Sequence, residues 1–306
     1  MPQSKVGYWG AATLSFNSIS EQYMMKNVRI IYNGRIPEAL DLSTTILHDL
    51  ALPEDTWVSP AENLQVLRER AKETELVITV GGDGTILRAA QVTAPSGIPM
   101  VGINMGRLGF MTELQVHEAL EKLPLYLEGE CRIEERYMLQ AQVIWGQPNG
   151  DHDDGPFHAL NDVVLARGAV SRVVIITGSI DGAQMSTFRA DAVILSTATG
   201  STGYNLAVGG PILDPASDAL VLKTVAAHMG LSAGLVLSGD TEVGLTLGGY
   251  EEATLSVDGY VDYTLTPGDR VVVKQSPYKA KFLRANPPSH FYATLTRRLG
   301  FSIRGQ

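Results

Sequence analysis

Short hydrophobic runs alternate with longer amphipathic segments over the first 127 residues of the chain. The runs at 28–32, 76–80 and 100–103 are rich in Val and Ile, and they predict buried strands. Helical spacing of hydrophobic residues follows these runs at 37–50, 61–74, 84–93 and 116–127. An alternation of this kind predicts a parallel sheet with helices on its faces, as in Rossmann-like α/β domains.

The pattern changes after residue 127. From 132 to 275, many short runs of Val, Ile, Thr and Leu are separated by Gly, Asp and Pro, which is typical of β structure. Helical spacing returns at 289–299. We therefore expect an α/β domain at 25–127, a β-rich, sandwich-like domain at 128–285, and a segment at 286–306 that packs back on the first domain.

The first 24 residues fit neither pattern, because the first predicted strand begins only at Val28. We expect residues 1–24 to be an N-terminal extension, with Met24 or Met25 as an alternative natural start.

Composition narrows the classes of function. Hydrophobic residues make up 44% of the chain and charged residues 19%, as in ordinary globular proteins. The net charge of -9 argues against a protein that grips the phosphates of DNA or RNA. The most apolar stretch, at 219–237, is interrupted by Lys223 and His228 and is unsuited to a membrane span. The single Cys131 excludes an internal disulfide, in agreement with a cytoplasmic location.

The first candidate for chemistry is the sequence Gly81-Gly82-Asp83-Gly84-Thr85, between a predicted strand and a predicted helix. Glycines let a phosphate approach the backbone, and the N–H groups at a helix start favour an anion. A carboxylate there repels phosphates unless Asp83 holds Mg²⁺ or accepts a proton from an attacking hydroxyl. Taken alone, the motif is equally compatible with a tight Asp-Gly turn.

A second glycine-rich turn follows the next predicted strand, at 102–110, and contains Arg107. Successive strand ends meet at one edge of a parallel sheet, so Arg107 could contact a phosphate there or lie in solvent. Further along, Asn161 and Asp162 stand before a predicted strand. An amide beside a carboxylate suits the paired hydroxyls of a ribose, although a plain turn before a strand is the stronger interpretation of two residues alone.

The longest candidate segment runs from Asp191 to Ile212 and contains STATGSTGYN followed by GGPI. Its hydroxyls and glycines can offer donors to a polyanion, and Tyr204 offers a face for a base or a nicotinamide ring. The alternative is a Ser/Thr-rich surface loop, which the closing Gly-Gly-Pro makes the weaker interpretation. The His residues show no metal-binding spacing, and the sequence assigns no metal ligand.

In order and spacing, these motifs resemble those of the NAD kinases. The matching pieces are GGDGT at 81–85, NMGRLGF at 104–110, LNDVVL at 160–165, DAVILSTATGSTGYNLAVGGPI at 191–212 and SVDG at 256–259. The resemblance implies an N-terminal α/β domain of the kind shared with diacylglycerol kinases and a C-terminal β-rich domain. It also implies transfer of the terminal phosphoryl group of ATP or polyphosphate to the 2′-hydroxyl of the adenosine ribose of NAD, which gives NADP.

The same resemblance implies roles for individual residues. Asp83 becomes the catalytic base, and the donor phosphates lie against Gly81, Gly82, Gly84, Thr85 and Arg107. Mg²⁺ is held mainly by the nucleotide phosphates. In this family Asp191 and its neighbours act across a subunit interface, so a homodimer or homotetramer is expected. The residues implied to bind NAD are Asp83, Gly84, Asn161, Asp162, Arg172, Arg189, Asp191, Thr202, Gly203, Tyr204, Asn205, Leu206, Ala207 and Tyr260.

The chain departs from the family pattern at a few positions. Asp162 stands where Glu is usual, Ala198 where Pro is frequent, and Gly203 where Ala is frequent. These changes bear on the nucleotide contacts more than on catalysis. Two alternatives remain at this point, namely a lipid kinase that shares the GGDGT motif and a catalytically silent NAD or NADP sensor.

Overall fold

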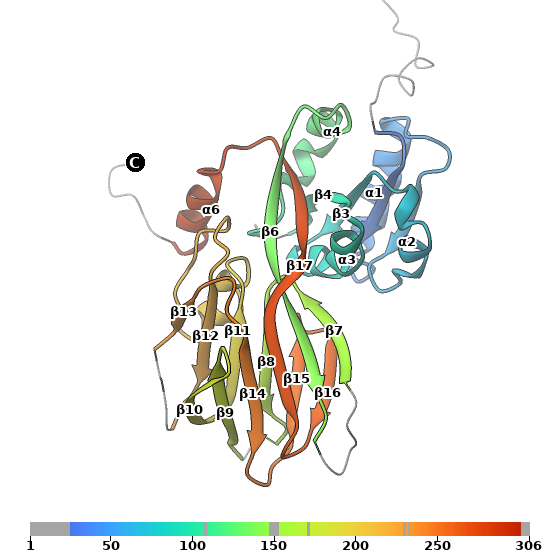
Figure 1. Ribbon diagram of the computed structural model, residues 1–306. Helices are drawn as coiled ribbons and strands as arrows, with labels where there is room; N and C mark the ends of the chain where they lie inside the picture. Colours follow the sequence, from blue (N-terminus) through green and yellow to red (C-terminus); the bar gives the residue numbers. More distant parts are fainter. Residues whose placement is uncertain are drawn as a thin grey trace, which may run out of the picture.

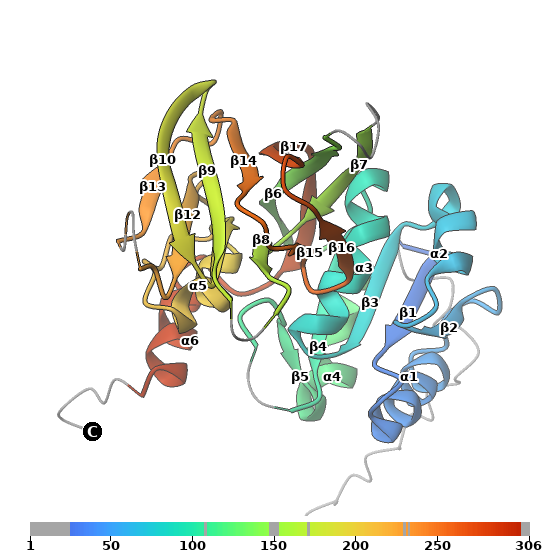
Figure 2. The ribbon, with the colours of Figure 1, turned by 90° about the horizontal axis from the view of Figure 1, so that it is seen from below.

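The computed structural model describes residues 25–106, 109–146, 153–169, 172–228, 231 and 233–300. The chain folds into an N-terminal α/β domain and a C-terminal domain built mostly of strands (Figures 1 and 2). The predicted fold class is therefore confirmed.

The α/β domain contains five strands and four α-helices among the described residues. Short 3-10 helices at Ala71–Glu73 and Val116–Glu118 lie directly after α2 and before α4. The elements are β1 (Val28–Tyr32), α1 (Pro37–Asp49), β2 (Trp57–Pro60), α2 (Gln65–Glu69), β3 (Leu76–Gly81), α3 (Asp83–Ser96), β4 (Pro99–Asn104), β5 (Leu114–Gln115) and α4 (Ala119–Leu127).

Strands β2, β1, β3 and β4 pair in that order, all parallel. Alternate residues face opposite sides of the sheet, as the strand period requires. Ile30 and Ile78 pack toward α1 and α4, whereas Ile31 and Val77 pack toward α2 and α3. Helices thus cover both faces of the parallel sheet, as the sequence predicted.

Two details of this domain differ from the prediction. The helix expected at 61–74 begins only at Gln65, since the Ala61 N–H bonds to Tyr32 O and the Asn63 side chain accepts from the Gln65 N–H. Strand β2 was not predicted, because it has four residues and ends in Pro60. The parallel pairing with β1 stabilises this segment as a strand, although its own hydrophobic run is too short to predict one.

The β-rich domain contains β6 (Arg132–Ile144), β7 (Asp153–Ala159), β8 (Asp162–Arg167), β9 (Val174–Ile180), β10 (Ala183–Ala190), β11 (Ala192–Ser196), β12 (Leu220–Val225), β13 (Leu235–Leu237), β14 (Val243–Gly248), β15 (Ala253–Val257), β16 (Val261–Leu265) and β17 (Arg270–Arg284). A 3-10 helix (Gly200–Thr202) and α5 (Tyr204–Ala207) follow β11, and α6 (His290–Arg298) follows β17.

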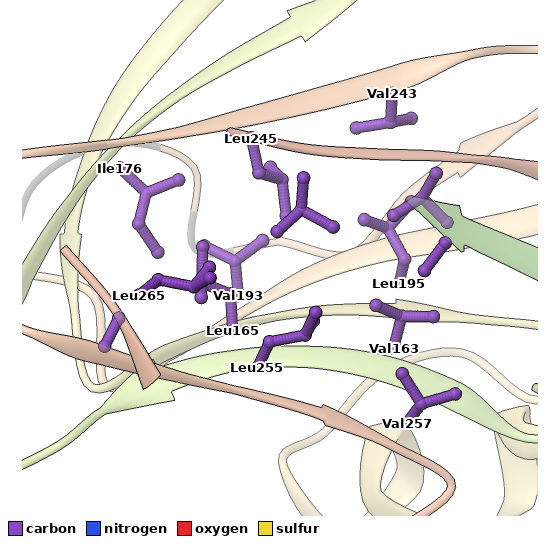
Figure 3. Packing of buried hydrophobic residues seen from close by; sticks show 14 of the residues in the cluster. Val163, Leu165, Ile176, Val193, Leu195, Val243, Leu245, Leu255, Val257 and Leu265 are labelled. Carbon is purple, nitrogen blue, oxygen red and sulfur yellow. The ribbon is translucent and has the colours of Figure 1, made fainter. Parts of the chain in front are cut away.

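One sheet of this domain runs in the order β13-β12-β11-β8-β15-β16 and is antiparallel. It packs on β6, β9, β14 and β17, which belong to the same sheet as the parallel strands. Val163, Leu195 and Leu255 from one sheet and Ile176 and Leu245 from the other fill the space between them (Figure 3). Two packed sheets form the sandwich-like domain that was predicted from the short runs of Val, Ile, Thr and Leu.

Strand β17 joins the two domains. Its first residues pair with β14, and its last residues pair in parallel with β4, at Lys281 with Pro99 and Phe282 with Met100. Strand β6 pairs antiparallel with nearly all of β17. As a result, the paired end of β17 and start of β6 lie beside the loop that follows β4, where Arg284 Nη1 donates to Met111 O.

Candidate active site

The GGDGT turn lies where β3 ends and α3 begins. Gly82 takes the N-cap position of α3 in an extended conformation, and Asp83 is the first helical residue. No side chain caps this 14-residue helix, so its first N–H groups face the space before it. A Cβ on Gly82 would meet no atom within 4 Å, which leaves open space for a ligand beside the backbone.

The Asp83 carboxylate is held by the loop after β4. Its Oδ2 accepts the Phe110 N–H at 2.9 Å, and its Oδ1 accepts the Met111 N–H at 3.1 Å. A Cβ on Gly109 would lie 2.2 Å from Oδ1, so only glycine allows this approach. The side chain keeps 28% of its surface exposed. Two motifs far apart in sequence therefore fix one accessible carboxylate.

Helix α6 completes the surroundings of Asp83. The Arg298 Nη1 lies 3.9 Å from Asp83 Oδ2, and its guanidinium stacks on the Phe110 ring at 4.0 Å. The Phe291 ring lies 6.1 Å from that of Phe110. Arg298 was not predicted to belong to the site, because nothing in the sequence of a terminal helix indicates which loop that helix will contact.

A cavity of about 190 Å³ lies beside the GGDGT turn. Gly82, Gly84 and Thr85 line it together with Arg35 and Arg88. Two arginines beside a helix N-terminus suit the oxygens of a polyphosphate. Sequence analysis missed both, although Arg88 follows Gly84 by one helical turn and this spacing places the two on one helix face.

Tyr260 closes the same cavity from the β-rich domain. Its hydroxyl donates to Gly84 O at 2.7 Å, and the Arg88 guanidinium lies 4.3 Å from its ring centroid. Tyr260 thus forms a contact between the two domains beside the GGDGT turn.

The segment Leu160–Asp162 is held by a carboxylate that sequence analysis did not single out, although it lies in the SVDG motif. Asp258 accepts the N–H groups of Leu160, Asn161 and Asp162 at 2.7, 2.8 and 3.0 Å. Its own N–H donates to Asp162 O. The Oδ1 of Asn161 is buried without a hydrogen-bond partner, as expected of a group whose partner is a ligand.

Asp162 and Asp258 are both buried acids. Burial, followed by the charge of Asp258, raises the pKa of Asp162 to about 7. Burial also raises the pKa of Asp258, to about 6, although its three backbone donors act in the opposite direction. Near neutral pH, Asp162 is therefore able to donate as well as accept a hydrogen bond.

The loop after β11 uses most of its hydroxyls to bond backbone carbonyls, in the loop itself and in the Leu160–Asp162 segment. Thr197 Oγ1 donates to Leu160 O at 2.6 Å, and Ser201 Oγ donates to Ala198 O. Asn205 is fully buried, and its amide donates to Ser201 O and Pro211 O. The hydroxyls of Thr197 and Ser201 thus bond to backbone carbonyls and do not face a polyanion, whereas the Oδ1 of Asn205 is buried without a hydrogen-bond partner among the described residues.

The exposed part of this loop is smaller. Thr202, Gly203 and Tyr204 keep accessible surface, and the Tyr204 ring is 43% exposed. Leu206 and Ala207, which belong to the same short helix, are also accessible. These residues offer the ring face and backbone expected of a nucleotide contact.

The structure does not bring Asp191, Arg172 and Arg189 to the GGDGT turn within one chain. Asp191 precedes β11 and pairs with Arg167 at 3.0 Å, whereas the site loop follows the other end of that strand. The five residues of β11 separate the two ends by roughly 16 Å, at about 3.3 Å per residue. Arg172 pairs with Glu251, and Arg107 lies outside the described residues.

None of the helices in the described ranges is long and apolar enough to cross a membrane. Within the same residues, no three His, Cys, Asp or Glu side chains come together in a way that could hold a metal ion.

Comparison with known proteins places these features in a family. Residues 21–131 match the model of the ATP-NAD kinase N-terminal domain, and residues 160–285 match that of the ATP-NAD kinase C-terminal domain. The NAD kinase of Dehalococcoides mccartyi strain CBDB1 is 38% identical over 277 residues, which cover 90% of this chain and 96% of the relative. That of Chloroflexus aggregans is 37% identical over 279 residues, which cover 90% and 99%.

Solved structures agree on the fold. Yeast NADH kinase complexed with NADH matches with a TM-score of 0.79 at 21% identity, over 92% of this chain and 89% of that one. An NAD kinase from Archaeoglobus fulgidus in complex with ATP matches with a TM-score of 0.71 at 21% identity, over 88% and 98%. With both family models and relatives of matching length, the chain belongs to the NAD kinase family of phosphotransferases.

Proposed function

We propose that this protein transfers the terminal phosphoryl group of ATP to the 2′-hydroxyl of the adenosine ribose of NAD, giving NADP. The observation that carries this proposal is the Asp83 carboxylate, held by the Phe110 and Met111 N–H groups at the start of an uncapped helix. The names of relatives over 90% of the chain support NAD as the acceptor.

In this proposal the two substrates take separate places. The donor phosphates would enter the cavity beside Gly82, where Arg35 and Arg88 balance their charge. The adenosine ribose would lie between Asp83 and the Asn161–Asp162 pair, with the exposed ring of Tyr204 beside the nucleotide. Polyphosphate presents the same oxygens as ATP, and we favour ATP because a family relative of the same fold was solved with ATP bound.

The chemical step needs little from the protein beyond placement and charge. The Asp83 carboxylate takes the proton of the 2′-hydroxyl as that oxygen bonds to the terminal phosphorus. The bond from this phosphorus to the bridging oxygen breaks, and ADP leaves. When bound, Mg²⁺ would neutralise charge on the donor phosphates. Because the described residues offer no cluster of ligands, the phosphate oxygens themselves would hold most of its coordination sphere.

Residues at the far end of β11 would act in a second copy of the chain. Asp191, Arg172 and Arg189 lie at the end of the sandwich opposite the site loop. A homo-oligomer that places this end against the NAD site of a neighbour would give all three a role, as the family resemblance implies.

The proposal is tested by measuring NADP formation from NAD with purified protein. ATP and polyphosphate are supplied in parallel, each with Mg²⁺ and with a chelator. We expect NADP with ATP and Mg²⁺, and little without the metal. NAD binding with no product from either donor would instead support the silent sensor, and phosphorylation of a lipid in vesicles would support the lipid kinase.

A further inference from the structure

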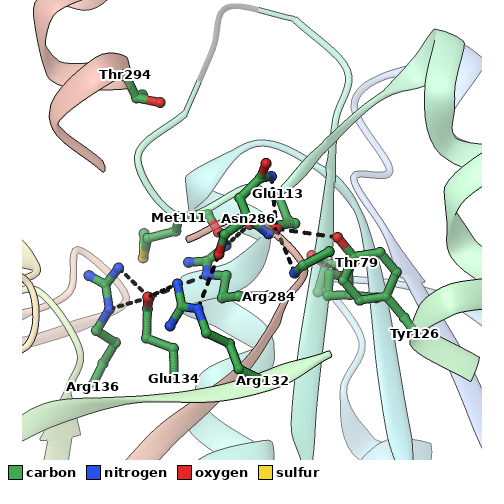
Figure 4. A network of polar contacts seen from close by, with 12 residues as sticks. Thr79, Met111, Glu113, Tyr126, Arg132, Glu134, Arg136, Arg284, Asn286 and Thr294 are labelled. Carbon is green, nitrogen blue, oxygen red and sulfur yellow. Dashed lines mark hydrogen bonds and ion pairs between the residues drawn. The ribbon is translucent and has the colours of Figure 1, made fainter. Parts of the chain in front are cut away.

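A network of charged residues, most of them buried, lies on strands β6 and β17 (Figure 4). At its centre is Glu134, whose side chain is 15% exposed. Its Oε1 accepts from Arg136 Nε and Nη2 at 2.8 and 2.6 Å, and from Arg284 Nε at 3.2 Å. Arg136 and Arg284 are 4% and 6% exposed. One carboxylate thus holds two buried guanidinium groups.

The first guanidinium reaches the loop that holds Asp83. Arg284 Nη1 donates to Met111 O at 2.8 Å and to Glu113 at 3.1 Å. Met111 uses its N–H to hold Asp83 Oδ1. The residue that positions the proposed base is therefore anchored at its carbonyl by Arg284, which is anchored in turn by Glu134.

The second guanidinium reaches the other half of the site. Arg136 Nη1 donates to Thr199 Oγ1 at 3.3 Å. Thr199 belongs to the loop after β11, and its carbonyl accepts from Thr202 Oγ1. Through Arg284, Glu134 thus connects to the loop that holds Asp83. Through Arg136, it connects to the loop proposed to bind NAD.

Stability alone does not explain this network. Two buried arginines on one carboxylate carry a large desolvation cost, and hydrophobic replacements of such groups are often neutral or stabilising. The Glu134 carboxyl nevertheless stays ionised. Burial alone would raise the pKa of Glu134, but Arg284 and Arg136 hold it at about 2. The fixed geometry of a guanidinium, with several N–H groups in one plane, is what lets each arginine join two partners.

We infer that Glu134 is a positioning residue that sets the placement of Asp83 relative to the NAD-binding loop through two separable arms, Arg284 toward Met111 and Arg136 toward Thr199. The inference rests on the proposed function and adds to it. Because the Arg284 arm ends at the base and the Arg136 arm ends at the nucleotide loop, the two arms control different kinetic constants.

The test replaces each arginine by lysine, which keeps the charge but cannot hold two partners in one plane. Arg284→Lys should lower kcat by about 100-fold, with the KM for NAD changed less than about threefold. Arg136→Lys should raise the KM for NAD by about tenfold and leave kcat nearly unchanged. Arg132→Lys is the matched control, since Arg132 also binds Glu134 but, among the residues that the structure describes, its other hydrogen bond goes to Asn286 O.

A combination with Asp83→Asn separates positioning from a general loss of structure. If Arg284 acts through Asp83, Arg284→Lys should reduce the residual rate of the Asp83→Asn protein by less than about twofold. A full further 100-fold loss in that background would overturn the inference. So would equal changes of the same constant in the Arg284 and Arg136 variants.

Hydrogen exchange gives a readout that does not depend on turnover. Arg284→Lys should speed exchange in a peptide covering 109–113, and Arg136→Lys in a peptide covering 196–203. Exchange that rises equally in both peptides for both variants would overturn the inference. Turnover by the wild-type protein in the same assays reports on the proposed function separately.

Discussion

The two domains place their site residues by different means. In the α/β domain, Asp83 and the Gly109–Met111 loop lie in the turns that directly follow β3 and β4, so the sheet itself brings them together. In the β-rich domain, the Leu160–Asp162 segment depends on Asp258, which lies 96 to 98 residues further along the chain. The comparison teaches that the first half of the site follows from local sequence and the second from long-range hydrogen bonds.

Among substitutions that keep Asp83 and compare the two domains, the largest effect is expected from a change at the contact between the two glycine turns. Gly109→Ala places a methyl group where the Asp83 carboxylate lies, at 2.2 Å from Oδ1. The carboxylate must move, and we expect kcat to fall by roughly 100-fold, because displacements of about 1 Å have that effect.

Gly106→Ala is the matched control, since a Cβ there meets no atom within 4 Å. It should keep kcat near the wild-type value in the same steady-state assay. Equal losses of kcat in the two variants would show that the loop tolerates no side chain at either position. That result would contradict a specific role for the contact between Gly109 and Asp83.

A smaller effect is expected in the β-rich domain. Asp258→Asn can keep two of the three backbone N–H bonds through Oδ1, but its Nδ2 then faces the Leu160 N–H. One buried unsatisfied donor costs about 1–3 kcal/mol. We expect Tm to fall by about 5 °C, and kcat/KM for NAD to fall by roughly tenfold as Asn161 shifts.

Calorimetry and steady-state kinetics check this prediction. Asp262→Asn, at an exposed position of the neighbouring strand β16, should change neither quantity. A wild-type Tm for Asp258→Asn would contradict the idea that this carboxylate builds the segment.

The smallest effect concerns the dependence of stability on pH. Asp162 has a folded-state pKa of about 7, above its ordinary value near 4. Between these values the folded protein holds a proton that the unfolded chain has released, so this group makes stability fall as pH rises through the window. Asp162→Asn removes that loss.

Thermal melting without ligand measures the effect. The Asp162→Asn protein should melt several degrees above wild type at pH 8 and close to it at pH 4.5. Asp240→Asn, an exposed control, should show no such pH-dependent gap. A gap that is constant from pH 4.5 to pH 8 would contradict the raised pKa.

Much of the fold and part of the site could be predicted from sequence, for physical reasons. Short hydrophobic runs and Gly-rich turns act locally, so strands such as Val28–Tyr32 and the place of Asp83 could be predicted. The hydroxyls of Thr197 and Ser201 were misinterpreted, because composition does not reveal whether a hydroxyl faces a ligand or its own backbone.

The remaining residues of the site depend on tertiary contacts. Arg284 meets Met111 across 173 residues, and no local pattern distinguishes Arg284 from an ordinary arginine in a strand. Arg298 meets Asp83 only after α6 has packed against Phe110. Contacts of this kind become visible only once the long strand β17 is placed between the domains.

The most direct test of the central claim compares wild type and Asp83→Asn in a single-turnover measurement of NADP formation, with NAD binding measured by calorimetry on the same samples. We predict similar affinity for NAD and a rate lowered by about 10²–10⁴-fold, because the carboxylate accepts the proton of the attacking hydroxyl. A rate near that of wild type, with NAD bound equally well, would contradict the assignment of Asp83 as the base.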